Sequence, residues 1–525
     1  MKRFILLVYI LLSAIVLKAQ IPGALDFSFG NFGKTLLDWN GDLNSAAAIK
    51  FTADGGMVVC GTNGYLGGNN SCLLAKFNSD GLLDESFGTN GIVQFGYGGE
   101  TSYANDLIIQ SEGRILAAGL SAEAGNISIG LARFTSSGEP DNTFGFSGKL
   151  IVNIGEYETA NTIVSLPNNK FAITGSIDSP ATNLDMLVMR FLSNGSTDVS
   201  FGTNGYISLD LNNSSTDMPR GMIFHNNKFT IASYAFKQAT DAVALVRLNA
   251  DGSLDTGFGV GGKSVIDGFK IMDMIAETGS QMAFDYQGRI VVSGQFLGLT
   301  GTDPMLLRFL SNGYPDNSFG DFGMAVYQIT GDNALQALAV QADGKIVAAG
   351  SSNSSNRNTF IMRVLDNGDL DPTFGMGDGY SVHQLGQGSS NVDGANAMLI
   401  QNNNKAVLAG YADTQNNSWD FCISRYYLGV VTGGGNEATY INMNAFIDPV
   451  DKNRITITGE HIINKMQSIS LLNAAGQICH TWNGSQINYS GNNIILNLNK
   501  APEPGVYLLQ LSGQNILASA KLICF

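Results

Sequence analysis

The chain has 525 residues, and its 29 Lys and Arg residues against 44 Asp and Glu give a formal net charge of −15. This acidic balance argues against a surface that follows nucleic-acid phosphates, and 44% hydrophobic residues are too many for a disordered chain. Only 14% of the residues are charged and 64 are glycine, a composition that favours short strands joined by tight turns.

The first 20 residues have the layout of a secretory signal peptide. Lys2 and Arg3 precede a mostly apolar run over residues 4–17, and Ala19-Gln20 offers a cleavage site. That run is too short to span a bilayer comfortably, and no other stretch of the chain reaches the necessary length. We therefore expect residues 1–20 to be removed on the way to the periplasm and the mature chain to lack a transmembrane segment.

A repeat dominates the sequence between residues 21 and 428. The pattern Asp-x-x-Phe-Gly recurs at spacings of 58, 57, 57, 57, 61 and 55 residues, beginning at Asp26, Asp84, Asp141, Asp198, Asp255, Asp316 and Asp371. Each unit of about 57 residues holds four β-rich runs joined by turns such as Ala342-Asp343-Gly344. We expect the four runs of a unit to form one small antiparallel sheet.

Such a sheet cannot bury both faces alone, so successive units must pack on one another. Seven four-stranded sheets around an axis make a β-propeller, which leaves few exposed sheet edges. An open β-solenoid is the alternative, because a period alone does not prove closure. The predicted fold class is therefore all-β, a seven-bladed β-propeller over residues 21–428 followed by a small Ig-like β-sandwich.

A basic residue ends the last β-rich run of every unit, and the first six lie eight residues before the next repeat Asp. Arg425 has no acid eight residues later, and Asp26, at the other end of the array, is the acid left without a partner from a repeat unit. We expect these two to pair across the junction of a closed ring. The alternative is that the Asp side chains only bond turn amides. The basic residues are Lys76, Arg133, Arg190, Arg247, Arg308, Arg363 and Arg425.

These motifs resemble a known repeat family. The element Leu-Asp-x-x-Phe-Gly-x-x-Gly, with runs such as Gln341-Ala-Asp-Gly-Lys-Ile-Val-Ala-Ala-Gly350 and Gly130-Leu-Ala-Arg-Phe134, is similar to the delta-60 repeat of bacterial secreted proteins. The resemblance covers residues 25 to 428. It implies a secreted β-propeller and brings no general activity with it.

After residue 428 the repeat stops. Residues 429–439 contain three consecutive glycines and favour a flexible linker, and residues 440–525 show new strand-like runs. Phe446-Ile-Asp-Pro449, Pro504-Gly-Val-Tyr507 and the terminal Lys521-Leu-Ile resemble the C-terminal sorting domain (type A-like) of the type IX secretion system of Bacteroidota. The resemblance implies that the secretion machinery is a partner and that the protein is secreted or held at the outer-membrane surface.

Five cysteines and four histidines do not suggest a metal site. The chain has no CxxC pair, which argues against zinc. Cys60 and Cys72 can face each other across a hairpin, but Cys60 falls where other units place Ala118, Thr174 or Ala349. We therefore expect Cys60 and Cys72 to be small buried core residues and not to form a disulfide.

The most suggestive polar positions lie five residues after the repeat glycine. If the strand that carries them is innermost, their side chains ring one mouth of the channel and suit a cation or the hydroxyls of a sugar. The alternative is that a strand simply ends there and polar residues meet water. The candidate ligand-binding residues are Asp38, Asn153, Asp210, Asp267, Gln328 and Gln384, with Gly96 in the remaining unit.

Three classes of function follow. The first is a non-catalytic secreted or cell-surface propeller that binds glycans, peptides or envelope proteins, without a cofactor and without nucleic acid. The second is an extracellular polysaccharide hydrolase or lyase, in which acids such as Asp210 and Asp267 face each other in a cleft. The third is a structural spacer. We name no catalytic residue, because His225 and His383 lie in different units and no nucleophile elbow is present.

Overall fold

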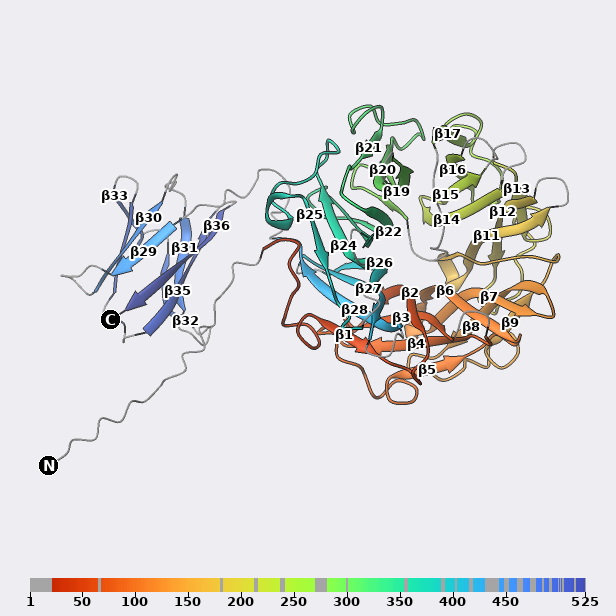
Figure 1. Ribbon diagram of the computed structural model, residues 1–525, viewed down its shortest axis with the longest axis horizontal. Coiled ribbons are helices and arrows are strands. Elements are labelled where there is room, and N and C mark those ends of the chain that lie inside the picture. The colour runs from red at the N-terminus through yellow and green to blue at the C-terminus, as the bar shows by residue number, and fades with distance from the viewer. Residues whose placement is uncertain are drawn as a thin grey trace. The chain divides into compact units, whose positions relative to one another are not determined.

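The computed structural model divides the chain into two compact units, Met1–Val430 and Val431–Phe525 (Figure 1). The first unit is described over residues 21–429, apart from 65–67, 180–182, 212–215, 237–240, 270–280, 299–300, 354–356, 389–391, 402–403 and 415–418. The second is described at residues 443–447, 453–459, 466–472, 478–483, 486–490, 493–498, 500, 502, 505–513 and 516–524. The expected signal peptide and all of the linker but residue 429 therefore lie outside the described residues.

The described part of the first unit contains seven four-stranded antiparallel sheets, which we call blades 1 to 7. Blades 1 and 2 are β2 (Asn44–Phe51), β3 (Met57–Asn63), β4 (Ser71–Phe77), β5 (Ile92–Phe95), and β6 (Thr101–Ile109), β7 (Ile115–Glu123), β8 (Asn126–Phe134), β9 (Lys149–Val152). Blades 3 and 4 are β10 (Thr162–Ser165), β11 (Phe171–Ser179), β12 (Asn183–Phe191), β13 (Tyr206–Leu209), and β14 (Thr216–His225), β15 (Lys228–Phe236), β16 (Asp241–Asn249), β17 (Lys263–Phe269).

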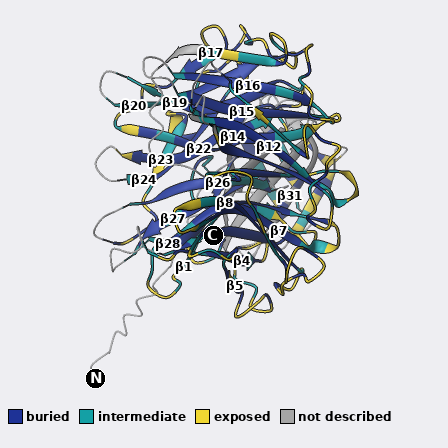
Figure 2. Cartoon of the chain, turned by 90° about the vertical axis from the view of Figure 1, so that its right-hand side faces the viewer, coloured by how far each residue is buried: buried dark blue, intermediate teal, exposed yellow. Residues whose placement is uncertain are grey.

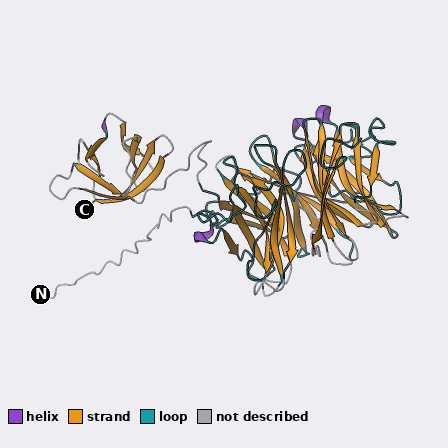
Figure 3. Cartoon of the chain, turned by 90° about the horizontal axis from the view of Figure 1, so that it is seen from above, coloured by secondary structure: helices purple, strands orange, loops and turns teal. Residues whose placement is uncertain are grey.

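Blades 5 and 6 are β18 (Met282–Phe284), β19 (Ile290–Leu297), β20 (Thr302–Phe309), β21 (Met324–Val326), and β22 (Asp332–Val340), β23 (Ile346–Asn353), β24 (Arg357–Val364), β25 (Tyr380–His383). Blade 7 is β26 (Gly394–Gln401), β27 (Lys405–Asp413), β28 (Trp419–Tyr427) and β1 (Lys34–Leu37). Strands and loops make up nearly all of this unit, and its helical turns are η1 (Ser111–Gly113), η2 (Pro167–Asn169) and η3 (Gly375–Gly377) (Figure 3).

The blades form a closed ring around a central axis. The first strand of each blade contacts the first strand of the next, and β26 of blade 7 contacts β2 of blade 1. Blade 7 is completed from the N-terminal end of the chain, because β1 pairs with β28 and Leu36 lies opposite Cys422. The prediction of an all-β, seven-bladed β-propeller is therefore confirmed.

The order of strands within a blade differs from the prediction. The run after each Phe-Gly turn was expected to be the innermost strand of its unit, but it is the outermost strand of the preceding three. The next run is innermost, and it carries small residues such as Ala46, Ala47 and Ala48 in β2. Small side chains suit the crowded positions near the axis, whereas the outermost strands β1 and β13 are only half-buried.

Adjacent blades pack on one another through clusters of buried apolar residues, and Figure 2 shows how much of their strands is buried. Between blades 7 and 1, for example, Val407 and Phe421 pack with Ile49 and Leu73. Every other pair of neighbours has a cluster of the same kind, which supplies the core that one sheet alone cannot.

The Phe-Gly turn locks each blade onto the next one. Its phenylalanine is buried against the glycine of the neighbouring β-turn, so that a Cβ added at Gly81 would lie 2.4 Å from the Phe29 ring. The following glycine N–H donates to a carbonyl of the same neighbouring turn. These seven donations are Gly30 to Asp80, Gly88 to Ser137, Gly145 to Asn194, Gly202 to Asp251, Gly259 to Asn312, Gly320 to Asn367 and Gly375 to Pro22.

The second unit contains two four-stranded sheets in its described part. One has the order β29 (Met443–Ile447), β30 (Arg454–Gly459), β34 (Asn493–Asn497), β33 (Asn488–Ser490), and the other β32 (Ile478–Asn483), β31 (Met466–Leu472), β35 (Gly505–Gly513), β36 (Ile516–Cys524). Ile455, Ile457, Ile469 and Trp482 are buried. The Ig-like assignment stays a prediction, and Asp448-Pro449 lies outside the described residues.

Candidate functional site

The innermost strands enclose a cavity of about 530 Å³ in the central channel. Strands β2, β6, β10, β14, β18 and β22 all contribute to its wall. Its size is in the range of small-molecule binding sites. The wall is mostly apolar and includes Ile108, Val164, Ile223, Phe224, Phe284 and Leu338.

One ion pair interrupts this apolar wall. Lys50 Nζ on β2 lies 3.1 Å from Asp106 Oδ1 on β6, and these two are the charged residues among those that line the cavity. A smaller cavity of about 150 Å³ shares both residues, so the pair stands where the two spaces meet.

Asp106 is held in place by the backbone around it. Its Oδ1 accepts from the N–H of Leu107 at 2.8 Å, and its Oδ2 accepts from the N–H of Ile163 on the neighbouring blade at 3.1 Å. The carboxylate side chain is only 11% exposed, whereas the Lys50 side chain is 35% exposed. The acid is therefore a fixed support, and the ammonium group is the part that meets the cavity.

A belt of amide side chains ties the inner strands together beside the cavity. Strands β2, β6, β14, β22 and β26 each carry a β-bulge, which turns one residue out of the ladder. Amides at the bulge of β6 and β26, and at the equivalent positions just before β10 and β18, donate to a carbonyl on or just before the inner strand of a neighbouring blade: Asn105 to Ala160 (3.0 Å), Asn161 to Pro219 (3.1 Å), Gln281 to Leu335 (3.4 Å) and Asn396 to Ala46 (2.7 Å). The last bond spans the ring closure.

The polar ring predicted for the channel mouth is not at the channel. Its residues lie on, or within two residues after, the outermost strands of seven different blades, because the strand order is shifted by one strand from the one assumed. Asp38, for example, is exposed and accepts from the Gly41 N–H at 2.9 Å. The same correction applies to Asn153, Asp210, Asp267, Gln328, Gln384 and Gly96.

The structure brings together all seven pairs of a basic residue and a repeat Asp. Arg425 on β28 meets Asp26 before β1, as the ring hypothesis requires. Their nitrogen–oxygen distances are 3.0 Å for Lys76–Asp84, 2.8 Å for Arg133–Asp141, 3.0 Å for Arg190–Asp198, 2.6 Å for Arg247–Asp255, 2.8 Å for Arg308–Asp316, 2.8 Å for Arg363–Asp371 and 2.7 Å for Arg425–Asp26.

Each arginine of these pairs also stacks on the phenylalanine of its turn. The Arg425 guanidinium lies 4.6 Å from the centre of the Phe29 ring, and the other five arginines make the same contact. The Nη1 of Arg425 also donates to the Ser79 carbonyl of blade 1 at 3.0 Å. The pairs are therefore structural clamps between blades.

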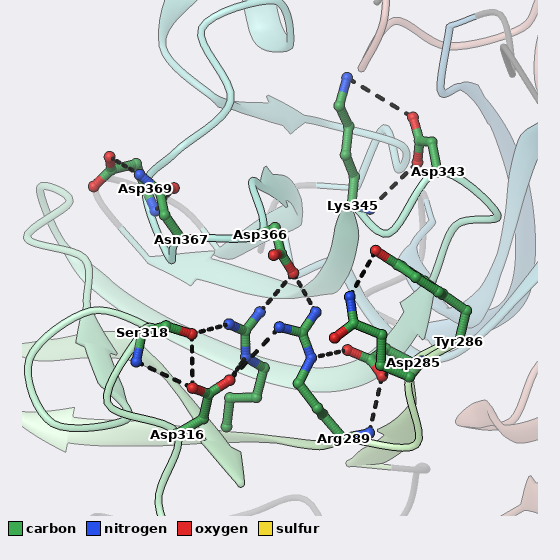
Figure 4. A network of polar contacts seen from close by, with 12 residues as sticks. Asp285, Tyr286, Arg289, Asp316, Ser318, Asp343, Lys345, Asp366, Asn367 and Asp369 are labelled. Atoms are coloured by element: carbon green, nitrogen blue, oxygen red, sulfur yellow. Dashed lines mark hydrogen bonds and ion pairs between the residues drawn. The ribbon is translucent and has the colours of Figure 1, made fainter. Parts of the chain in front are cut away.

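A second cation reinforces several of these carboxylates. Burial disfavours the charged form of Asp26, but hydrogen bonds from Lys405, Tyr427 and Ser28 outweigh it and hold the pKa of Asp26 below its usual value. Figure 4 shows the densest example, in which the repeat carboxylate Asp316, paired with Arg308, also lies 3.6 Å from Arg289, which in turn contacts Asp285 and Asp366.

Other titratable groups offer no catalytic or metal cluster in the described part of the chain. His225 is exposed, and His383 contacts the Gly23 carbonyl at 2.9 Å while burial lowers its pKa. No group of three potential metal ligands occurs among the described residues. Cys60 and Cys72 are free and buried. No helix of the described chain is both long and apolar enough to cross a membrane.

Sequence reasoning missed Lys50, Asp106 and the amide belt. The signal was present, because the position of Lys50 is occupied in the other units by Ile108, Val164, Ile223, Ala283, Ala339 and Leu399. Lys50 is the one cation among apolar residues at this position of the seven units. It would have stood out as a candidate ligand-binding residue if the position had been known to face the axis.

Comparison with known proteins supports the architecture. A family model described as "Domain of unknown function (DUF5122) beta-propeller" matches residues 52–87, 110–144, 230–258, 288–319 and 341–374. A β-propeller repeat family is thus found in five stretches of the chain. The search of curated proteins gives no match.

Three solved structures are similar to this chain at low sequence identity. A virginiamycin B lyase from Staphylococcus aureus with quinupristin is 12% identical, with a TM-score of 0.41 over 74% of this chain and 98% of that one. A polysaccharide lyase, Uly1, is 10% identical with a TM-score of 0.41 over 73% and 90%. A protein of unknown function from Dyadobacter fermentans is 10% identical with a TM-score of 0.41 over 76% and 98%.

Proposed function

We propose that the propeller is a non-catalytic binding module that takes its ligand into the central channel. The observation that carries this proposal is the cavity of about 530 Å³, whose wall is largely apolar and holds a single ion pair. Burial of apolar ligand surface in such a space supplies about 25 cal/mol per Å² before the costs of association. A rigid ring of this kind needs little rearrangement to bind.

The binding interpretation is preferred to the enzyme interpretation on the placement of acids. Glycoside hydrolysis needs two carboxyl groups roughly 5 to 10 Å apart across a cleft. Asp210 and Asp267 belong to the outermost strands of blades 3 and 4, away from the cavity wall. Asp106, which does line the cavity, already accepts two backbone N–H groups and pairs with Lys50.

We further propose that the protein acts outside the cell or at its surface. Support comes from the layout of residues 1–20 and from the resemblance of residues 440–525 to a sorting domain for the type IX machinery. Fractionation of cells that produce the full chain, or a chain ending at residue 428, tests this. Loss of the shortened chain from the medium and the outer surface supports the proposal, and unchanged export contradicts it.

A neutral fluorescent probe tests binding in the channel. N-phenyl-1-naphthylamine brightens in apolar surroundings and carries no charge at neutral pH. We expect saturable binding at one site, weakened at least tenfold by Ile223→Asp, because a charge in the wall disfavours an apolar ligand. The matched control is Val199→Asp, since Val199 is 73% exposed outside the cavity. The absence of saturable binding to the folded wild-type protein contradicts the proposal.

A further inference from the structure

The channel cavity has one cation whose hydrogen-bonding capacity is not used up. An ammonium group has three N–H donors. Among the described residues, Asp106 is the one ion-pair partner of Lys50, and the Lys50 side chain remains 35% exposed at the cavity wall. Donors are therefore left that can reach a group inside the cavity.

Asp106 fixes the position of this ammonium group and does not itself remain available to a ligand. Both of its oxygens accept backbone N–H groups, from Leu107 and Ile163, in addition to the contact with Lys50. A carboxylate fixed by these donors holds its cation in one place. Asp106 is thus a positioning residue, and Lys50 is the direct contact.

The walls beyond the ion pair are largely apolar, and the hydroxyl side chains that line them are those of Thr162 and Ser165. Val164, Ile223, Phe284 and Leu338 come from four different blades and surround the same space. A ligand with several polar groups would lose hydrogen bonds to water there and find few replacements. A ligand with one anionic end and an apolar body loses little, because its charged end meets Lys50.

We infer that the channel binds amphipathic monocarboxylates, with the carboxylate on Lys50 Nζ and the apolar chain along the wall formed by β10, β14, β18 and β22. This inference rests on the proposed binding function and names the ligand class for the same site. The chemistry is shared by a medium-chain fatty acid and by the free C-terminus of an apolar peptide.

Calorimetric titration with matched ligands tests the inference. Decanoate, decan-1-ol and decyltrimethylammonium carry the same chain with a negative, neutral and positive end. We expect decanoate to bind at least tenfold more tightly than decan-1-ol and the cation to bind most weakly, since a hydrogen bond to a charged group is worth about 10- to 100-fold in affinity. Equal affinity for the three ligands would overturn the inference.

Variants of Lys50 test the residue assignment. Lys50→Met should weaken decanoate binding about 10- to 100-fold and leave decan-1-ol unchanged, because only the charged contact is lost. Lys50→Arg should retain the preference for decanoate. The double variant Lys50→Met with Asp106→Asn leaves no unpaired charge and should give the same loss if the single variant does not fold. Lys149→Met on the outer strand β9 is the matched control.

The outcomes separate the inference from the proposed function. Binding of N-phenyl-1-naphthylamine without a preference for decanoate overturns the monocarboxylate inference alone. Failure of every ligand overturns the binding function as well. N-acetyl-trileucine, with its C-terminal amide as the uncharged counterpart, distinguishes the two sources of the carboxylate ligand. Tighter binding of the peptide acid than of decanoate indicates a peptide terminus, and the reverse indicates a fatty acid.

Discussion

Asp420 is a buried acidic side chain whose surroundings disfavour its ionised form. It is only 3% exposed on β28, and its Oδ1 has no hydrogen-bond partner among the described residues. Burial, opposed by a hydrogen bond from Thr414 and reinforced by the charges of Asp38 and Asp413, raises the pKa of Asp420 to about 6. Ionising this carboxyl in the folded protein is therefore unfavourable.

Asp420→Asn should increase stability above pH 6 and have little effect at pH 4. Between the unfolded pKa near 3.8 and the folded pKa near 6, the native state holds a proton that the unfolded state has released, so the stability of the wild type falls as pH rises. The variant should gain about 3 kcal/mol over the wild type across this window. Urea denaturation at pH 4, 5, 6 and 7 measures it, and a difference that does not change with pH would contradict the assignment.

Lys76 is the one member of its series that is not an arginine. It pairs with Asp84 at 3.0 Å, but this Asp is 28% exposed, whereas Asp141 and Asp198 are each 7% exposed. Lys76→Arg should place a guanidinium over Phe87 and raise the unfolding free energy by about 0.5–1 kcal/mol. Lys149→Arg serves as the control in the same denaturation experiment. A loss of stability in Lys76→Arg would show that blade 1 cannot accommodate the arginine contacts that the other blades make.

The clamp of blade 7 matters because it joins elements from the two ends of the repeat array. Arg425 on β28 and Asp26 before β1 are 4% and 0% exposed in their side chains. Arg425→Met leaves Asp26 buried with Lys405 as its remaining cation and should destabilise the propeller by about 3 kcal/mol. Lys76→Met, at the equivalent but more exposed position of blade 1, should cost much less. Denaturant unfolding of both variants decides this, and equal costs would contradict the special role of the junction.

The number of blades and the closing pair could be predicted from the sequence, because both depend on recurrence. Seven Asp-x-x-Phe-Gly turns and an unmatched Arg425 at one end with an unmatched Asp26 at the other indicate the ring without any coordinates. The phase of the repeat could not be predicted this way. A period does not say where a blade begins, and each unit contributes one strand to the preceding blade.

That shift of one strand explains why the predicted site was misplaced. Asp38 and Gln328 were expected at the axis but follow outermost strands, while Lys50 and Asp106 on inner strands were overlooked. The amino-acid composition of the runs contained the information needed to identify the innermost strand. The crowded inner strands β2 and β26 carry alanine on both sides of their bulges, and Gly119 on the neighbouring strand β7 is required because an added Cβ would lie 1.9 Å from the Tyr103 carbonyl oxygen on β6.

At the scale of the whole molecule, the channel exists only if the ring closes. Closure joins β1 to β28 and Asn396 to Ala46, contacts between parts of the chain some 350 to 400 residues apart. Contacts of such long range form late in folding, because the entropy of closing the loop must be overcome first. The channel wall therefore assembles only after the last blade is available.

A cross-link across the junction tests closure most directly. Leu36 on β1 lies opposite Cys422 on β28, and both belong to one apolar cluster. In Leu36→Cys, mild oxidation followed by non-reducing peptide mapping should identify a disulfide between positions 36 and 422 within one chain, and this disulfide should be absent when Cys422→Ala is added. Absence of that intrachain disulfide in the folded protein, or its formation only between two chains, would contradict the closed seven-bladed ring.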